Sequence, residues 1–426
     1  MARLLMRRRV GAAYALGACA MLLAASEARA GGYDTPVVYS ARHVGMGGTS
    51  IGYVDDASAI VLNPAGLRGV KSFALLGDVS LLLARVQGSP DLGKDATSVE
   101  SEPALGPFAL IAAGYRVHPW LTLGLGAYPV ASGGATYDYT NVAGIRTVDE
   151  TRIVFLELSP ALSLNLPDDA LLPGALAFGV GYRVDALLFE RHKGPPGNPV
   201  VIDLALSGMS ATGLRLGAQW RLNSHWSFGL TYRTRVDVSA EGDAGTALSQ
   251  VIEDPHATFV LPAKLGVGAR LDVDRIGVAV DLEHGFYSGN GQAPLRGSIG
   301  GVSGSVSNVF AWRDAQTLRT GLEYRLGETQ QVPVRAGYVF DGTVSNPRYP
   351  SAFGTPPGPT HSLTVGIGYR FTSVQLNAAY AYRFGTAQVD AANLAPSTAC
   401  RFCSQAGEYA LRMHGFYVDA SFSLPE

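Results

Sequence analysis

Two cysteines near the C-terminus have the spacing that best suits redox or metal chemistry. Cys400 and Cys403 lie in a predicted loop, and the histidine that could join them as a ligand is the more distant His414. No histidine directly follows Cys403, which excludes covalent haem attachment. In an exported loop, a local disulfide is the default for such a pair. The sequence therefore predicts a Cys400–Cys403 disulfide, with a redox dithiol or a metal site as the alternatives.

The histidines and glycines do not add a second site. The 8 histidines are scattered without metal-ligand spacing, and His43 is expected to be a structural hydrogen-bonding residue. Gly45 and Gly47 could begin a dinucleotide-binding loop, but Ser50 stands where that loop needs its third glycine. We therefore expect no catalytic residue, no metal site and no cofactor. A hydrolase whose serine and histidine come from different strands is the alternative.

The N-terminus has the three-part layout of a secretory signal peptide. Arg3 and Arg7–Arg9 precede an uncharged apolar run, Val10–Ala25, and Ala28-Arg29-Ala30 supplies a small-x-small cleavage site. Leu16–Cys19 could also serve as a lipoprotein cleavage site, but the apolar run continues past it. The sequence predicts that residues 1–30 are a signal peptide, that cleavage follows Ala30, and that the chain is exported.

The composition excludes several classes of protein. Of the 426 residues, 16% are charged and 52 are glycine, whereas roughly 25% of residues are charged in a typical soluble protein. The formal net charge of −2 and the lack of a long Lys/Arg run argue against a nucleic-acid partner. After the signal, the longest uncharged stretch, 117–137, contains several prolines and glycines that break a helix. An exported chain of this kind is expected to cross a membrane as a closed β-barrel.

Period-two alternation supports this fold class. From Trp226 to Ala240, apolar residues such as Leu230 alternate with polar ones such as Arg233, and successive strand side chains point to opposite faces. We predict about fourteen antiparallel strands, an even number that suits a closed barrel. Short links alternate with long ones, as in outer-membrane barrels, and a secreted sandwich is the alternative. The predicted strands are 72–86, 106–118, 120–128, 152–165, 176–191, 208–222, 226–240, 256–272, 275–288, 311–326, 332–341, 361–371, 373–384 and 413–424.

Five arginines near the ends of predicted strands, just before short links, form a further candidate group. Aromatic residues precede four of them and suit an interfacial girdle. We expect the arginines to form a basic ring inside the periplasmic mouth and to pair with lumen carboxylates such as Asp272, Asp281, Glu283 and Glu323. Alternatively, some hold a plug or bind an anionic ligand. The candidate lumen arginines are Arg116, Arg221, Arg270, Arg325 and Arg370.

The segment before the first strand, residues 31–70, does not alternate and is too short to fold alone. It contains an acidic pair, Asp55 and Asp56, and then the run Asn63-Pro64-Ala65-Gly66-Leu67. Asn-Pro favours a turn, and glycines allow tight backbone routes. We expect this segment to fill the mouth of a wide barrel as a hatch, and residues 71–426 to form the barrel itself.

These motifs resemble those of the FadL/TodX-type family of outer-membrane transport proteins, which imports long-chain fatty acids and other hydrophobic compounds. Besides the hatch motifs, Leu261–Gly266, Val334–Tyr338 and Gly366–Tyr369 follow in the same order. The resemblance implies a fourteen-stranded barrel with an N-terminal hatch, gated at Asn63, Pro64, Ala65 and Gly66. It also implies a lateral opening where the third strand kinks inward. We expect that opening at Pro129, Gly133 and Gly134, because proline and glycine weaken strand pairing.

The functional hypothesis is passive uptake of a fatty acid, an aromatic hydrocarbon or a similar hydrophobic molecule. The resemblance implies a monomer in the lipid of a Gram-negative outer membrane. We expect Phe310, Trp312, Tyr349 and Phe353 to line the ligand's way in from the loops. A related barrel that acts as a scaffold or a protein-secretion component is the main alternative, and an aqueous porin is another.

Overall fold

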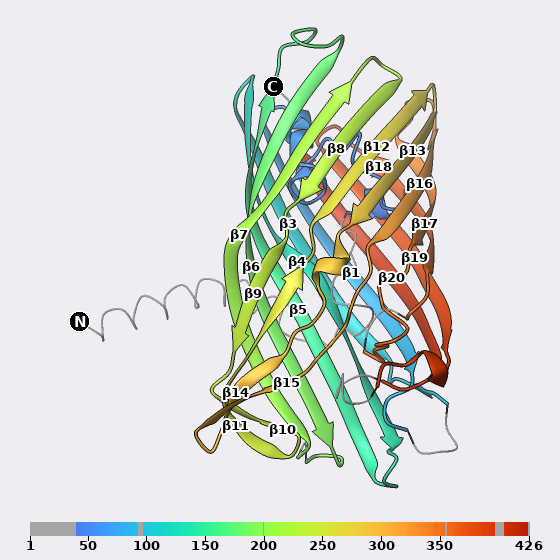
Figure 1. The fold of residues 1–426 in the computed structure, drawn as a ribbon. Helices are drawn as coiled ribbons and strands as arrows, with labels where there is room; N and C mark the ends of the chain where they lie inside the picture. The colour runs from blue at the N-terminus through green and yellow to red at the C-terminus, as the bar shows by residue number, and fades with distance from the viewer. Residues whose placement is uncertain (1–39, 93–96, 199, 354–355, 397–403, 425–426) are drawn as a thin grey trace, which may run out of the picture.

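The computed structural model describes residues 40–424 apart from 93–96, 199, 354–355 and 397–403. Within these residues the chain forms a closed antiparallel barrel (Figure 1), because β1 pairs with both β3 and the last strand, β20. Fourteen strands form the wall, as the sequence predicts. They are β1 (Phe73–Gly88), β3 (Ala104–His118), β4 (Leu121–Thr140), β5 (Arg146–Asn165), β6 (Ala175–Gly194), β7 (Ile202–Arg221), β8 (Trp226–Arg233) with β9 (Val236–Glu241), β11 (Gln250–Leu261) with β12 (Lys264–Val273), β13 (Ile276–Gly285), β16 (Ala315–Leu326), β17 (Val332–Asp341), β18 (Thr360–Arg370), β19 (Val374–Val389) and β20 (Gly407–Ser423).

Smaller elements lie in the connections and in the segment before β1. No helix of the described residues is long and apolar enough to cross a membrane. Short turns join the wall strands at one end of the barrel, and the short strands β10, β14 and β15 belong to long connections at the other end (Figure 1). The smaller elements are α2 (Ala41–Val44), α3 (Ala59–Leu62), η1 (Pro64–Gly69), β2 (Val99–Glu100), β10 (Ala244–Ala247), η2 (Tyr287–Gly289), β14 (Leu295–Ile299), β15 (Val302–Val306) and η3 (Ala391–Asn393).

The predicted third strand is wrong at its loop end. The sequence predicts a strand over 120–128 and a loop over 129–151, but β4 continues to Thr140 and β5 already begins at Arg146. Residues 128–137 of β4 are all buried. Because neither face of this stretch meets solvent or lipid, its sequence has no apolar–polar alternation that would reveal a strand.

Two other predicted strands are interrupted at the same height of the wall. The predicted strand 226–240 breaks at 234–235 between β8 and β9, and 256–272 breaks at 262–263 between β11 and β12. Pro262 lies in the second break, where it needs no ladder hydrogen bond. The predicted loops 241–255 and 289–310 also contain strands, namely β10 with the start of β11, and β14 with β15.

The two faces of the wall differ as the alternation predicts. Outward side chains are apolar and exposed, such as Leu230 and Val365. Inward positions include buried charged residues such as Arg335 and Asp281. This arrangement suits a wall with hydrocarbon outside and a polar, filled lumen inside.

Residues 40–70 lie inside the barrel at the end with the short turns, and we call them the hatch segment (blue in Figure 1). Helix α2 packs against β18 and β19, and η1 packs against β5 and β6. Wall glycines make this close contact possible. A Cβ at Gly217 would overlap the side-chain oxygen of Asn63, and one at Gly337 would overlap the backbone of Gly47.

Candidate functional site

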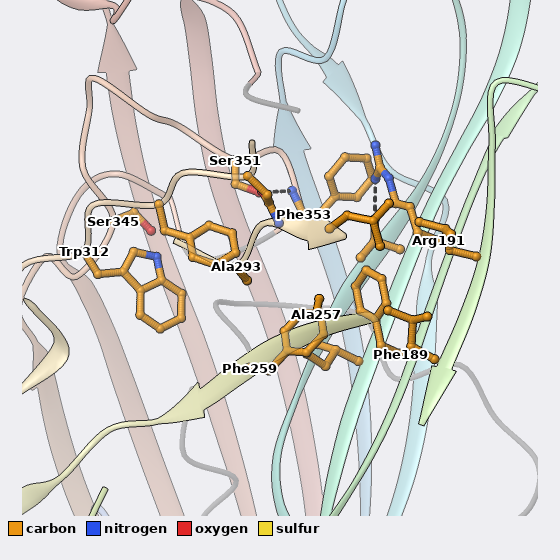
Figure 2. Close-up of a pocket in the computed structure, with 16 residues that line it drawn as sticks. Phe189, Arg191, Ala257, Phe259, Ala293, Trp312, Ser345, Ser351 and Phe353 are labelled. Carbon is orange, nitrogen blue, oxygen red and sulfur yellow. Dashed lines mark hydrogen bonds between the residues drawn. The ribbon is translucent and has the colours of Figure 1, made fainter. Parts of the chain in front are cut away.

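An apolar pocket lies at the end of the barrel with the long connections (Figure 2). Its cavity measures about 130 Å³, and its walls come from β5, β6, β7, β11 and β14 together with loop residues. The apolar character comes largely from β7 and β11, whose inward positions carry apolar side chains such as Leu204, Leu206 and Phe259. The lining residues are Thr151, Ile153, Phe189, Arg191, Leu204, Leu206, Ala257, Phe259, Ala293, Leu295, Asn308, Phe310, Trp312, Ser345, Ser351 and Phe353.

Aromatic rings form much of this lining. The centroids of Phe189 and Phe259 are 4.8 Å apart, and those of Phe310 and Trp312 are 5.6 Å apart. Phe353 faces them from the loop that follows β17. Phe310, Trp312 and Phe353 therefore line the pocket, as the sequence predicts. The fourth expected residue, Tyr349, is not among the lining residues.

The lining belongs to a larger set of packed apolar side chains that reaches the hatch segment. Ile153 and Phe259 of the pocket belong to the same packed cluster as Ile60 of the hatch and Val130 of β4. Val61 packs against this cluster as well. Packed apolar side chains therefore join the lining of the pocket to the inward side of β4 around Val130.

The predicted lateral opening falls within β4. The ladder between β3 and β4 ends at Ile111 and Ala127, although β3 stays paired with β1 as far as Ala104. Beyond that point β4 pairs with β5, with a register shift between Pro129 and Ala131. Across the gap, the Glu102 N–H donates to the backbone oxygen of Thr136 at 2.9 Å.

Gly133 and Gly134 lie in this separated stretch of β4. Gly134 has φ +142°, a backbone conformation that other residues rarely adopt. A Cβ at this position would also overlap the backbone oxygen of Thr151 on β5. The proline and the glycines thus lie on β4 beyond the point where its ladder with β3 ends. Their role as a lateral opening stays a prediction.

The hatch turn is held by Asn63, which is fully buried. Its Nδ2 donates to the backbone oxygens of Ile51 at 2.8 Å and Ala218 at 3.1 Å, and its Oδ1 accepts from the Ala65 N–H. Pro64 follows as the first residue of η1, and Ala65 and Gly66 are buried beside it. One asparagine therefore ties the turn to the hatch and to wall strand β7.

The acidic pair of the hatch binds a hatch arginine. Arg42 Nη1 lies 2.6 Å from Asp55 Oδ1 and 3.3 Å from Asp56 Oδ2. Burial opposes ionisation of Asp55, but the Arg42 guanidinium outweighs it and holds the pKa of this carboxyl below its usual value. Asp56 also accepts the Ser58 N–H at 2.8 Å. The pair therefore braces the hatch from within.

Three of the five candidate lumen arginines converge on the same carboxylates. Arg270 and Arg325 each pair with both Asp272 and Glu323, and Arg370 Nη2 lies 4.0 Å from Glu323. Glu323 is 2% exposed, so several cations neutralise one buried anion. This part of the predicted pairing exists in the structure.

The other two candidate arginines lie next to the hatch segment, and Arg221 stands two strands from Arg270 at the same level of the wall, because the register places both opposite Ser227. Arg116 donates to the backbone oxygen of Arg68, and both line a second cavity with Arg221 and Asp55 between hatch and wall.

The remaining predicted carboxylates also have partners other than these arginines. Asp281 Oδ2 accepts the N–H groups of Ser50 at 2.7 Å and Ile51 at 3.1 Å. Glu283 Oε1 lies 3.7 Å from Lys264 and 3.5 Å from Arg319.

Other candidate chemistry is limited. The signal peptide, residues 31–39 of the predicted hatch, and Cys400 and Cys403 lie outside the described residues. Within the described part of the chain, no group of His, Cys, Asp and Glu could hold a metal ion. Gly48–Gly52 reads Gly-x-Ser-x-Gly, a pattern of hydrolase nucleophiles. Ser50, however, is buried between hatch and wall, next to Asp281.

A known protein family matches most of this chain. The family described as outer membrane protein transport protein (OMPP1/FadL/TodX) matches residues 21–413. The chain belongs to this family. The resemblance seen in the hatch motifs is thereby confirmed, and the protein is an outer-membrane transport barrel of the FadL/TodX type. A search of curated protein sequences finds no significant match.

Solved structures of FadL/TodX-type proteins share the fold. A Pseudomonas aeruginosa FadL homologue has a TM-score of 0.71 at 14% identity, over 94% of this chain and 100% of that one. The P. putida toluene transporter TodX has a TM-score of 0.66 at 15% identity, over 91% and 99%. The Ralstonia pickettii toluene transporter TbuX has 0.64 at 16%, over 92% and 99%.

The sequence interpretation missed much of the pocket of this FadL/TodX-type barrel. Thr151, Leu204 and Leu206 lie outside the predicted strands, because β5 and β7 extend further toward the loops than expected. Phe189 and Phe259 lie inside predicted strands, but nothing marked their inward side as ligand-binding. The alternation of residues 202–206 could have extended the seventh-strand prediction, since Ile202, Leu204 and Leu206 alternate with Asp203 and Ala205.

Proposed function

We propose that this barrel admits small hydrophobic molecules from the outer surface and releases them sideways into the outer membrane. The observation that carries the proposal is the apolar pocket at the loop end. Its packed surface continues to the place where β3 and β4 separate. Burial of apolar surface drives binding without directional contacts, so aromatic hydrocarbons and fatty acyl chains both fit the proposal.

Because the hatch fills the lumen, the ligand leaves through the wall and needs no water-filled pore along the barrel axis. Residues 40–70 fill the lumen between the pocket and the short-turn end, and the Asn63 turn fastens them to the wall. A hydrophobic molecule that leaves between β3 and β4 enters the bilayer directly and does not cross the charged layer around Glu323. Asn63–Gly66 and the Asp55–Asp56 pair thus act as fixed parts of a plug, with residues 31–70 as the hatch.

The proposal also covers the lipid contact, the oligomeric state and the export of the protein. The outward apolar side chains, such as Leu230 and Val365, contact membrane lipid. The barrel acts as a monomer, a proposal with which its closed ladder is compatible, because pairing of β1 with β20 leaves no open sheet edge for a second copy. The signal peptide is removed after Ala30 during export.

The test is uptake of labelled toluene and of a labelled long-chain fatty acid by a host that lacks its own transporter. The host expresses the barrel at an outer-membrane level verified by its heat-dependent gel mobility. Uptake of either label above the empty-vector background is the expected result. Uptake of neither by a folded, inserted barrel would contradict the proposal and favour a scaffold or secretion role.

A pocket-filling variant shows whether uptake uses this cavity. Ala257 is buried and lines the pocket, so Ala257→Trp should occupy it and reduce uptake at least several-fold. Ala205 is exposed on the outer face of neighbouring β7, so Ala205→Trp is the matched control and should leave uptake unchanged. Equal uptake by the two variants would show that ligand travels by another route.

A further inference from the structure

Among the described residues that line the apolar pocket, Arg191 of β6 is the one with a charged side chain. Its guanidinium carbon lies 4.1 Å from the centre of the Phe353 ring, beside which Figure 2 shows it. Nη1 donates to the Thr151 hydroxyl. An arginine in such a place could bind the carboxylate of an anionic ligand, if its charge were available.

The charge of Arg191 is already matched. Its Nη2 lies 2.8 Å from Oδ1 of Asp149, which stands on β5 and is 2% exposed at its side chain. Lys193 lies 3.4 Å from the same carboxylate and 2.9 Å from Asp91. The hydroxyl of Tyr139 donates to Asp91 and also reaches Asp149 at 3.4 Å. Two cations and two carboxylates therefore form one compact group beside the pocket.

Other charged residues of β5, β6 and β7 near the pocket are paired as well. Arg152 and Glu190 pair with each other at 3.5 Å on the same two strands. His192 Nδ1 lies 2.8 Å from Asp203, whose side chain is 50% exposed. Among the described lining residues, Arg191 is the one cation, and Asp149 already pairs with it. An anionic ligand would therefore lose its hydration without gaining an unmatched positive partner in this lining, and that loss is large for a carboxylate.

The size of the cavity points to the same kind of ligand. Its volume is about 130 Å³, close to the roughly 150 Å³ of an engineered apolar cavity that binds benzene. Rings of Phe189, Phe259 and Trp312 surround it, and an aromatic guest can pack against them edge-on or offset. A neutral single ring therefore fits both the volume and the charge of the site.

We propose that Asp149 determines the specificity of the pocket. By neutralising Arg191 it keeps the site uncharged, so that the pocket takes neutral single-ring aromatic molecules and rejects carboxylates of the same size. The proposal rests on the proposed function, because it concerns the ligand of the same uptake site. Asp149 acts through Arg191 and need not touch the ligand itself.

The experiment compares toluene with benzoate, which have similar rings and differ in charge, on the purified full-length barrel in nanodiscs. The wild-type protein should bind toluene at least tenfold more tightly than benzoate. Asp149→Asn keeps the shape and frees one positive charge, so it should improve benzoate binding about tenfold, a change of about 1.4 kcal/mol. Toluene binding should change less than twofold.

Two further variants separate charge from damage to the fold. Asp203→Asn removes an acidic group near the pocket that pairs with His192, and it should leave both affinities unchanged. Asp149→Asn combined with Arg191→Gln removes both charges, and it should lose the gain in benzoate binding. If Asp149→Asn fails to fold, Asp91→Asn frees a charge of the same group at a more exposed place and should give a smaller gain.

The outcomes distinguish the two proposals. If the wild-type barrel takes up toluene but binds benzoate equally well, or if Asp149→Asn and Asp91→Asn leave the ratio unchanged, the role of Asp149 is overturned. If the wild-type barrel takes up the fatty acid but not toluene, the role of Asp149 is overturned and the proposed function stands. If it takes up neither, the proposed function itself fails.

Discussion

The two ends of the lumen differ in how their inward side chains are covered. At the hatch end, residues 40–70 lie against the wall, and buried charges such as Glu323 have partners, with Arg335 Nε at 2.8 Å. At the loop end, the side chains of Phe259, Trp312 and their neighbours surround a cavity of about 130 Å³.

This difference separates stability from recognition. Buried charges are costly unless they are paired, so the hatch end is fixed by a set of mutually dependent ion pairs and hydrogen bonds. Apolar walls around a cavity lack the contacts that a close-packed interior would give them. A hydrophobic ligand restores those contacts at the loop end, whereas the cavity at the hatch end is lined by charged side chains such as Arg221 and Asp55 and does not suit an apolar guest.

The largest expected effect comes from breaking the charge group at the hatch end. Glu323→Gln removes the anion shared by Arg270, Arg325 and Arg335 and leaves buried cations without it. We expect the free energy of unfolding to fall by about 3–5 kcal/mol. Denaturant titration of the detergent-solubilised barrel, followed by gel mobility, measures this loss.

A surface carboxylate provides the comparison for that variant. Glu100 pairs with Arg85 at 3.1 Å, and both side chains are about half exposed. Glu100→Gln should therefore change the unfolding free energy by less than about 1 kcal/mol. Equal losses for the two variants would mean that the lumen charges are solvated and that the contrast between the two ends is wrong.

A smaller effect is expected where the hatch touches the wall. Gly217→Ala places a methyl group against the Asn63 side chain and should weaken docking of the hatch by about 1–3 kcal/mol. Faster cleavage of residues 40–70 by an added protease, with the barrel still folded, is the readout. Gly77→Ala is the matched control, because a Cβ at that position meets nothing within 4 Å. Unchanged cleavage of Gly217→Ala would show that the contact is loose.

The smallest effect, absent at neutral pH, concerns His43 of the hatch. Burial, and then the nearby charge of Arg42, lower the pKa of His43 to about 4, against about 6.5 in an unfolded chain. Between these values the undocked hatch binds a proton that the docked hatch does not. Docking is therefore at full strength above pH 6.5 and weakens as the pH falls toward 4.

Amide hydrogen exchange of Ala41–Gly48 at pH 7 and pH 5 tests this prediction, after correction for intrinsic exchange rates. Protection should fall at pH 5 in the wild-type barrel and should not fall in His43→Gln. Asp55 contributes little in this window, because its pKa lies below its usual value and it stays ionised. A pH effect of the same size in His43→Gln would assign the change to another group.

Much of the architecture could be predicted because outward apolar side chains alternate with inward ones along most wall strands. Strand 332–341 coincides with β17 at both ends, since its apolar side chains alternate with Arg335 and Gly337 toward the lumen. This alternation fails in β4 after Tyr128, where both faces are buried, and at 262–263, where the wall strand is interrupted. These failures lie where the barrel departs from a regular wall.

The sequence alone determined the fold class, the fourteen strands and the family, because side-chain periodicity and the Asn63–Gly66 run are properties of neighbouring residues. Only the tertiary structure decided that Arg191 faces Asp149 beside an apolar cavity, and that Arg270 and Arg325 share Asp272 and Glu323. These arrangements depend on strand register, on loops that fold back and on the position of the hatch. Such features arise from contacts between residues far apart in the chain, and local spacing does not encode them.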